Sequence, residues 1–267
     1  MIRALLQLTV AFVVLMGSFA HAAPPPGVMA GERAKVAAVV DGDTVVLDKR
    51  VEGAIEVRLV GLQAPKLPLG RVGFQAWPLA EEAKAVLLSL VQGRIVELHY
   101  GGARMDRNGR RLAHLVLENG TWIQGAMLER GMARVYSFAD NRGAVAEMLA
   151  LEAAARTARR GIWAHPFYAL LTPEETAGRI DTFQIVEGRV LGTIRVGGRT
   201  YLNFGADWRT DFTVTVASAA ERLFRRQGLD PVTFEGRQVR VRGWLGSYNG
   251  PTIEATHPEQ LELLELP

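Results

Sequence analysis

The feature that most strongly constrains the fold of the first half of this chain is a pair of β-branched and apolar runs on either side of an Asp-Gly pair. They form the segment Val39-Val40-Asp41-Gly42-Asp43-Thr44-Val45-Val46-Leu47. Asp-Gly is typical of the tight turn between two antiparallel strands, because it supplies residues that tolerate positive φ. The segment predicts a hairpin with two aspartates at its tip. Turn aspartates often serve local hydrogen bonds only, whereas two carboxylates at the strand period could also bind a cation together.

The residues around this hairpin continue the β pattern. Strand, turn, strand, loop and strand are predicted from Lys35 to Val60, and Ile55, Val57 and Leu59 alternate with polar neighbours. Arg58 is therefore expected on the polar face of a strand that leads into a Gln63-Ala64-Pro65 loop. Further strands are predicted at 94–100 and 111–117, and helices at 79–91, 122–130 and 144–160.

Four arginines surround the Asn-Gly turn that joins the strands at 94–100 and 111–117. They are Arg104, Arg107, Arg110 and Arg111. A solvated, charged hairpin is one interpretation. The other is an anion cradle, because guanidinium groups bind phosphate in bidentate geometry.

The length and spacing of elements predict two domains. The chain has 267 residues, more than one domain of common size. Strands are predicted at 183–196, 199–204, 212–216, 239–245 and 252–256, with a helix at 217–226, which suits a small barrel. We predict a signal peptide at 1–22, a leader at 23–33, a first domain at 34–167, a linker at 168–180 and a second domain at 181–267.

The charge and cysteine content limit which kinds of site and ligand this chain can have. The chain has no cysteine, so disulfides, thiolate nucleophiles and zinc-thiolate sites are excluded. Its net charge is only +3, but residues 33–167 hold 19 basic and 14 acidic residues, against 11 and 13 for residues 168–267. The basic surplus that a polyanion would attract belongs to the first half.

The N-terminus has the pattern of a secretory signal. Arg3 precedes an apolar run from Ala4 to Met16, and Ala20-His21-Ala22 provides a small-residue cleavage site. The run is shorter than the roughly 20 residues of a membrane-spanning helix. We predict cleavage near Ala22, a periplasmic or secreted protein, and no stable membrane insertion afterwards; an uncleaved anchor is the alternative.

Five motifs in order make the first half resemble the staphylococcal nuclease-like (thermonuclease) family over about residues 35–166. They are Val-Asp-Gly-Asp-Thr at 40–44, Val-Arg-Leu at 57–59 before a proline loop, Asp-Arg-Asn-Gly-Arg at 106–110, Gly-Met-Ala-Arg-Val-Tyr at 131–136, and Arg-Arg-Gly-Ile-Trp at 159–163. The resemblance implies a mainly β fold with helices: a five-stranded OB-type barrel with three helices, and calcium-dependent hydrolysis of DNA and RNA. A second, smaller OB-like barrel is expected to follow.

The resemblance also implies roles for single residues. Asp43 matches a calcium-ligating aspartate and Asp41 the carboxylate just outside it. Arg58 and Arg110 match the arginines that hold the scissile phosphate and stabilise the transition state. Arg107 and Arg111 are expected to contact substrate beside them.

Three positions depart from the family pattern. Gln63 replaces a second ligating aspartate, Ala64 occupies the position that ligates through a backbone carbonyl, and Lys66 replaces the glutamate general base. Calcium needs oxygen ligands with enough negative charge to offset its dehydration, so we expect calcium to bind weakly or not at all. Lys66 could act as a base if its pKa were lowered, or it could join Arg58 and Arg110 in binding phosphate.

The remaining aromatic and histidine residues give weaker signals. Aromatic residues of the second half could stack on bases, but its acidic balance favours barrel core for them; they are Tyr201, Phe204, Trp208, Trp244 and Tyr248. His99 and His114 could meet across paired strands, without a third metal ligand.

Three functions stay open. The sequence favours an exported nuclease-family protein that binds nucleic acid or another polyanion, with impaired hydrolysis. An active calcium-dependent nuclease and a non-catalytic, partner-binding tandem barrel are the alternatives.

Overall fold

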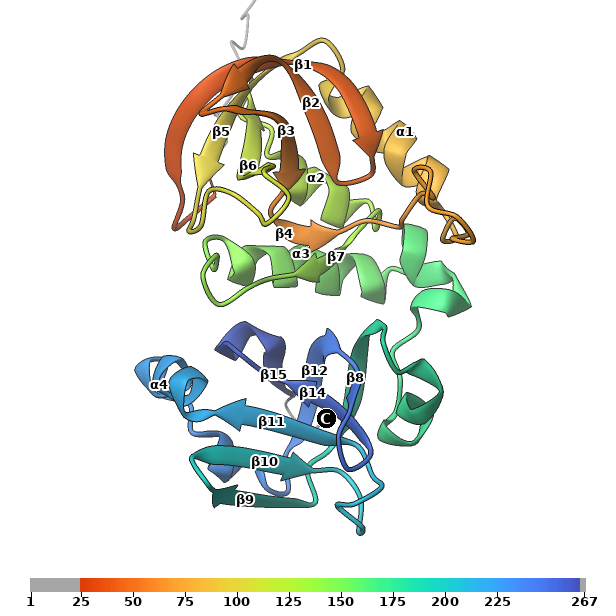
Figure 1. The fold of residues 1–267 in the computed structure, drawn as a ribbon, viewed down its shortest axis with the longest axis vertical. Helices are drawn as coiled ribbons and strands as arrows, with labels where there is room; N and C mark the ends of the chain where they lie inside the picture. The colour runs from red at the N-terminus through yellow and green to blue at the C-terminus, as the bar shows by residue number, and fades with distance from the viewer. Residues whose placement is uncertain (1–24, 265–267) are drawn as a thin grey trace, which may run out of the picture.

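A closed five-stranded barrel forms the first half of the chain in the computed structural model, which describes residues 25–264 (Figure 1). Its strands follow the order β1-β2-β3-β6-β5, and only the β3–β6 pair is parallel. Their bounds are β1 Met29–Asp41, β2 Thr44–Val51, β3 Ala54–Leu59, β5 Ile95–Tyr100 and β6 Arg111–Leu117. The predicted mainly β fold with an OB-type barrel is confirmed. The predicted signal peptide, residues 1–22, lies outside the described residues.

Strand β1 is longer than the sequence pattern suggests, because it pairs with both β2 and β5 and so closes the barrel. Irregularities in its pairing with β2 lie between Val36 and Ala38 and between Val39 and Asp41, and such bulges bend a strand. The strand begins at Met29, so the last part of the predicted leader is strand.

The Asp-Gly hairpin forms as predicted, with Asp41 paired to Thr44. Gly42, however, is not among the residues with positive φ. It is needed for space instead, since a Cβ there would lie 2.6 Å from the Cβ of Ala64 and 2.9 Å from that of Ala83. The glycine thus lets the 64–66 loop and a helix approach the hairpin tip closely.

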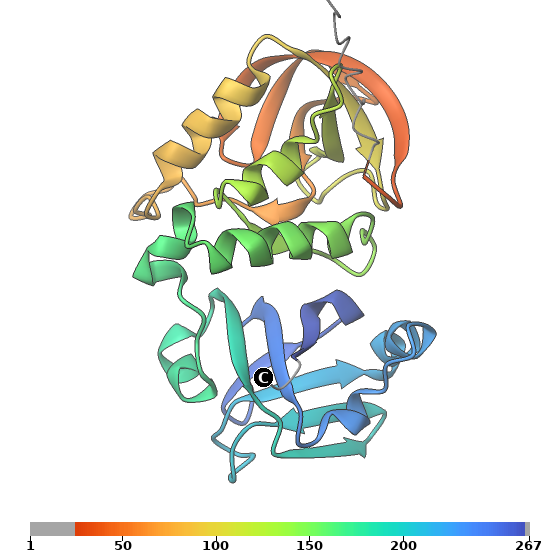
Figure 2. The same ribbon diagram turned by 180° about the vertical axis from the view of Figure 1, so that it is seen from behind.

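Three helices and a small strand pair surround the barrel. The helices are α1 Ala80–Val91, α2 Ile123–Glu129 and α3 Val145–Thr157. Strand β4, Gly61–Gln63, pairs antiparallel with β7, Arg134–Tyr136. From front and back, α3 and this pair lie between the barrel and the C-terminal sheets (Figures 1 and 2).

The C-terminal half contains two open sheets where a second barrel was expected. One has the order β13-β14-β11-β10-β9 and the other β15-β12-β8. Only Leu245 separates β12 from β13, so the chain turns there from one sheet into the other. The bounds are β8 Phe183–Arg189, β9 Gly192–Val196, β10 Arg199–Asn203, β11 Thr213–Ala217, α4 Ser218–Arg226, β12 Gln238–Trp244, β13 Gly246–Ser247, β14 Pro251–Glu254 and β15 Leu261–Leu264. Within residues 25–264, no helix combines the length and apolar character needed to cross a bilayer.

Each half buries its own apolar cluster, and a polar network joins the two. The buried carboxylate of Glu152 on α3 accepts hydrogen bonds at 3.0 and 2.9 Å from both terminal nitrogens of Arg242 on β12. Ser137 and His257 form another contact between the halves, at 2.8 Å. Burial raises the pKa of Glu152, but the charge of Arg242 outweighs burial and holds it below the ordinary value. The pair therefore stays ionised inside the interface.

Candidate functional site

A fully buried carboxylate, that of Asp43, lies at the centre of the candidate site. The hairpin tip between β1 and β2 carries it, and its side chain has 0% exposure. The backbone N–H of Ala64 donates to its Oδ2 at 2.8 Å, and the N–H of Asp43 itself donates to Asp41 at 3.1 Å. A buried carboxylate is stable only when paired and hydrogen-bonded, so the cations around Asp43 decide what the site can do.

Arg58 reaches Asp43 from the neighbouring strand. Thr44 and Arg58 are register partners in the β2–β3 pair, which places the guanidinium beside the hairpin tip. One terminal nitrogen forms an ion pair with the Asp43 carboxylate and donates to the Asp43 carbonyl at 3.1 Å. The other donates to the Leu62 carbonyl at 3.0 Å. The structure thus brings Arg58 and Asp43 together, with the guanidinium already held by protein groups.

Lys66 is the second cation on the same carboxylate. Its Nζ lies 2.6 Å from Oδ2 and 2.8 Å from Oδ1 of Asp43, and 3.6 Å from Oδ2 of Asp41. The sequence allowed Lys66 two roles, a general base or a phosphate contact. In the structure its ammonium donates to both oxygens of Asp43, and a base needs a free lone pair directed at water. The geometry therefore favours an internal ion pair over either role.

Burial and charge set the protonation of these groups. Burial raises the pKa of Asp43, but the charges of Arg58 and Lys66 outweigh it and hold that pKa well below the ordinary value. Burial, together with the neighbouring charge of Asp43, raises the pKa of Asp41. Burial lowers the pKa of Lys66, although Asp43 acts in the opposite direction. The cluster thus contains as many acidic groups as basic groups: the carboxyls of Asp41 and Asp43, and the side chains of Arg58 and Lys66.

Gln63 and Ala64 do not take the positions expected of metal ligands. The Gln63 amide oxygen accepts hydrogen bonds at 3.0 and 2.8 Å from the buried guanidinium of Arg134, because β4 pairs with β7 in the register Gln63–Arg134. At Ala64 the backbone N–H, rather than the carbonyl, is bonded to the Asp43 carboxylate. Sequence reasoning did not identify Arg134, because its contact with Gln63 exists only once β4 and β7 pair.

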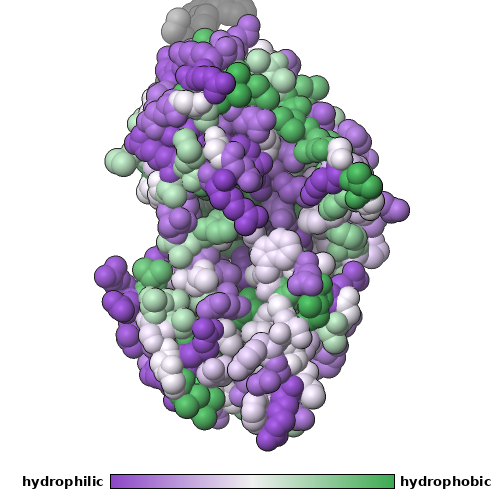
Figure 3. Space-filling model, in the orientation of Figure 1, coloured by the Kyte–Doolittle hydropathy of each residue, from purple (hydrophilic) through white to green (hydrophobic). Residues whose placement is uncertain are grey.

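Arg110 directly precedes β6, in which Leu112 pairs with Arg58 across the parallel β3–β6 ladder. Its guanidinium forms an ion pair with Asp106 at 2.7 Å and is partly exposed. Arg107, at the turn, is exposed. Hydrophilic side chains gather at the centre of the barrel half in Figure 3, where the β5–β6 connection crosses its front in Figure 1.

Arg111 corrects the expectation that all hairpin arginines face a substrate. Arg111 is the first residue of β6, and its side chain is buried within the protein. It is 2% exposed, bonds to Glu52 at 2.5 Å and stacks on Tyr100. Arg111 is therefore unable to contact a ligand at the surface.

The donor set does not fit calcium. Within residues 25–264, the structure has no group of three acidic or histidine side chains arranged to hold a metal. Asp43 is bonded to two cations and Gln63 to a third, and calcium would have to displace Lys66 from 2.6 Å. His99 and His114 are register partners on β5 and β6, as predicted, and burial lowers the pKa of His114 to about 4.

Comparisons with known proteins match the barrel half. The model of a family described as staphylococcal nuclease homologue matches residues 56–165, which include Arg58, Gln63, Lys66 and Arg110 and begin after Asp43. Protein ParB of Escherichia coli is 32% identical over 144 residues, covering 50% of this chain and 73% of ParB. An uncharacterized protein of Bacillus anthracis is 34% identical over 134 residues, 49% of this chain and 60% of that protein.

A plant protein gives a further match. A probable staphylococcal-like nuclease of Oryza sativa subsp. japonica is 32% identical over 108 residues. The match covers 40% of this chain and only 28% of the rice protein. The chain thus spans less than two thirds of the Bacillus anthracis and rice proteins.

Proposed function

Because this chain belongs to the staphylococcal nuclease homologue family, we propose that its barrel binds nucleic acid, or another polyanion, and that phosphodiester hydrolysis at the Asp43 site is impaired. The observation that carries this proposal is the contact of Lys66 Nζ with both oxygens of Asp43, at 2.6 and 2.8 Å. In this arrangement a side-chain ammonium occupies the position where the family pattern would need a metal ion and a base.

The proposed impairment of hydrolysis rests on the residues at the base position and around Asp43. A phosphodiester-cleaving site must activate water and stabilise the charge that develops on the phosphate. The position of the family's general base holds Lys66, whose ammonium is bonded to Asp43. The guanidinium of Arg58 is bonded to Asp43 and to two backbone carbonyls, so a phosphate would have to compete for it.

Binding of a polyanion is supported by the charge of the barrel half. Residues 33–167 carry a surplus of five positive charges, and phosphate contacts by Lys and Arg supply most of the sequence-independent affinity for nucleic acid. The exposed Arg107 and the partly exposed Arg110 lie on the connection between β5 and β6 in the barrel half. We place the nucleic-acid contact on this β5–β6 hairpin.

A paired binding and cleavage assay tests the proposal on residues 23–267. Single- and double-stranded DNA are incubated with the protein in calcium and in chelator; cleavage is followed on gels and binding by fluorescence anisotropy at increasing salt. We expect binding that is independent of calcium and weakens with salt, without cleavage. Calcium-dependent cutting that Arg58→Ala abolishes would instead establish an active nuclease. Absence of binding to either DNA would leave the partner-binding alternative.

We further propose that the protein is exported to the periplasm or secreted and is not held in the membrane after cleavage near Ala22. Support comes from the N-terminal sequence, in which Arg3 precedes an apolar run and the small-residue site Ala20-His21-Ala22 follows it. This segment lies outside the described residues. Cell fractionation and N-terminal sequencing of the mature protein test this. An intact Met1 on a membrane-associated protein would show an uncleaved anchor instead.

A further inference from the structure

The outer face of the five-stranded C-terminal sheet carries a long groove, which we call the sheet groove. It consists of two adjoining cavities of about 550 and 660 Å³. Both are lined by Tyr201, Thr215, Tyr248 and Thr252, so they share a wall and form one depression across β9, β10, β11 and β14. The groove lies in the C-terminal half, apart from the Asp43 site.

Strand register determines which side chains line the groove. Tyr201 is opposite Ile194 on one side and Thr215 on the other, and Thr215 is opposite Glu254. These residues share a face because side chains alternate along a strand. The alternate residues, such as Leu202, Val214 and Ile253, point into the buried apolar cluster. The groove face is therefore the solvent side of a sheet whose other side is core.

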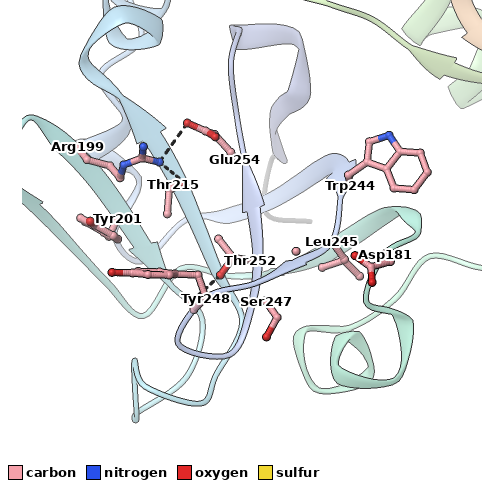
Figure 4. Close-up of a pocket in the computed structure, with 11 residues that line it drawn as sticks. Asp181, Arg199, Tyr201, Thr215, Trp244, Leu245, Ser247, Tyr248, Thr252 and Glu254 are labelled. Carbon is pink, nitrogen blue, oxygen red and sulfur yellow. Dashed lines mark hydrogen bonds and ion pairs between the residues drawn. The ribbon is translucent and has the colours of Figure 1, made fainter.

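Three aromatic residues that the sequence favoured as core are exposed here. Trp208 is 50% exposed, Trp244 51% and Tyr248 70%. Only Phe204 of the expected core aromatics is buried, and Tyr201 is intermediate. In Figure 4 the Tyr248 ring reaches across the sheet toward Tyr201, and Trp244 lies at the other end of the pocket near Asp181. Exposed rings around a depression are typical of a surface that binds something.

The charges in and beside the groove do not suit a polyanion. Arg199 donates to Glu254 and to Thr215, each at 3.1 Å (Figure 4). Arg209, next to Trp208, lies 3.7 Å from Asp207. The lining also includes the exposed carboxylates of Asp181 and Glu235. Each of these arginines thus has a carboxylate partner, and a phosphate backbone would meet net negative charge.

The backbone of the groove does not suit an extended peptide. Strands β10, β11 and β14 are hydrogen-bonded to neighbours on both sides. A peptide that adds to a sheet needs a free strand edge, which among the four strands of the groove only the end strand β9 offers, beside the groove and not across it. What this face offers is side chains: aromatic rings between hydroxyl, amide and carboxylate groups, including Asn203, Asn249 and Ser247. Recognition must use flat apolar surfaces together with many neutral hydrogen-bonding groups.

We propose that the sheet groove binds an uncharged oligosaccharide. The apolar faces of sugar rings can pack on Tyr248, Tyr201 and Trp208, while their hydroxyls exchange hydrogen bonds with the threonine, asparagine and carboxylate groups between them. Because Arg199 and Arg209 are each paired with a carboxylate, a neutral oligomer suits this groove better than a polyanion does. Two adjoining cavities suit a short oligomer better than a single ring.

Calorimetric titration of residues 23–267 with two neutral probes, a β-1,4-linked glucose hexamer and an N-acetylglucosamine hexamer, tests the proposal. We expect saturable binding of at least one probe. Tyr248→Ala should weaken it at least about tenfold, a loss of about 1.4 kcal/mol, whereas Tyr248→Phe, which keeps the ring, should stay within about threefold. Phe167→Ala removes an aromatic ring outside the groove that is 39% exposed, against 70% for Tyr248, and should bind as the unmodified protein does.

Three results would overturn the proposal. The first is saturable binding of neither hexamer. The second is sugar binding that neither Tyr248→Ala nor Trp208→Ala weakens, with both variants shown to be folded by thermal melting. The third is preferential, Tyr248-dependent binding of an oligothymidine or a lysine-rich peptide, because it would assign the groove to nucleic acid or to a cationic partner.

Discussion

Replacing Lys66 by glutamate reverses the charge next to the buried Asp43 carboxylate. Lys66 Nζ now lies 2.6 Å from Asp43 and 3.6 Å from Asp41. The change would leave Asp41, Asp43 and the new glutamate around Arg58, a set of oxygen ligands with a net negative charge. We therefore expect Lys66→Glu to be less stable than the unmodified protein in chelator and to gain a stabilising response to calcium.

The size of both effects can be worked out. Two like charges about 5 Å apart at an effective dielectric constant of about 20 repel by about 3 kcal/mol, and the loss of the Lys66–Asp43 ion pair adds to this. At about 2 to 4 °C per kcal/mol for a chain of this size, the repulsion alone should lower the midpoint temperature of unfolding (Tm) by about 6 to 12 °C. A new site with a Kd of about 1 mM, within the weak range for calcium, would return about 1.4 kcal/mol at 10 mM calcium. That corresponds to a rise of about 3 to 6 °C.

Thermal melting in chelator and in 10 mM calcium measures both effects without reference to activity. Gln75→Asp with Lys49→Glu makes a larger charge change at exposed positions and should show no calcium response. Adding Gln63→Asp to Lys66→Glu should raise calcium affinity little, because Arg134 would hold the new carboxylate as it now holds Gln63. The reasoning is refuted if Lys66→Glu melts like the unmodified protein in chelator, or if calcium leaves its Tm unchanged.

Three further outcomes are expected. Arg242→Leu leaves the Glu152 carboxylate buried without its main partner and should lower the free energy of unfolding, measured by urea titration, by about 3 to 5 kcal/mol. Adding Glu152→Leu to this variant should recover much of the lost stability. Burial lowers the pKa of His114 and His257 to about 4. As the pH falls, the unfolded chain therefore takes up protons at these histidines before the folded chain does, and the free energy of unfolding should fall between pH 6.5 and pH 4 by about 3 kcal/mol per histidine. A melting temperature that stays constant over this pH range would contradict the prediction. Arg107→Ala should weaken DNA binding and reduce its salt slope by about one unit. Arg222, which is also exposed but lies on α4, is the control, and Arg222→Ala should leave both unchanged.

Local patterns predicted the barrel strands, whereas the family resemblance implied that Asp43 and Arg58 belong to one site. The hairpin around Gly42 and the alternation around Arg58 are properties of neighbouring residues, so they can be recognised without coordinates. The predicted helix at 79–91 appears as α1, Ala80–Val91, for the same reason. Motif order then placed these elements in one family.

Contacts between distant segments could not be predicted in this way. Gln63 meets Arg134 only through the pairing of β4 with β7. Arg111 was grouped with its arginine neighbours, although strand alternation alone would have turned it inward. Trp244 and Tyr248 were predicted to lie in the core because the prediction used the acidic charge balance of the whole second half. That balance does not distinguish the two faces of a sheet. Which aromatic residues stay exposed depends on the open sheet that formed where a closed barrel was expected.

The contact of Glu152 with Arg242 means that α3 is a wall shared by both halves. A fragment that ended before β8 would keep this carboxylate but lose the guanidinium that now covers it. The face of α3 that carries Glu152 would then be exposed to solvent, with the carboxylate left without its main cationic partner. Shuffling either half into another protein would therefore require redesign of this helix, even though each half has a core of its own.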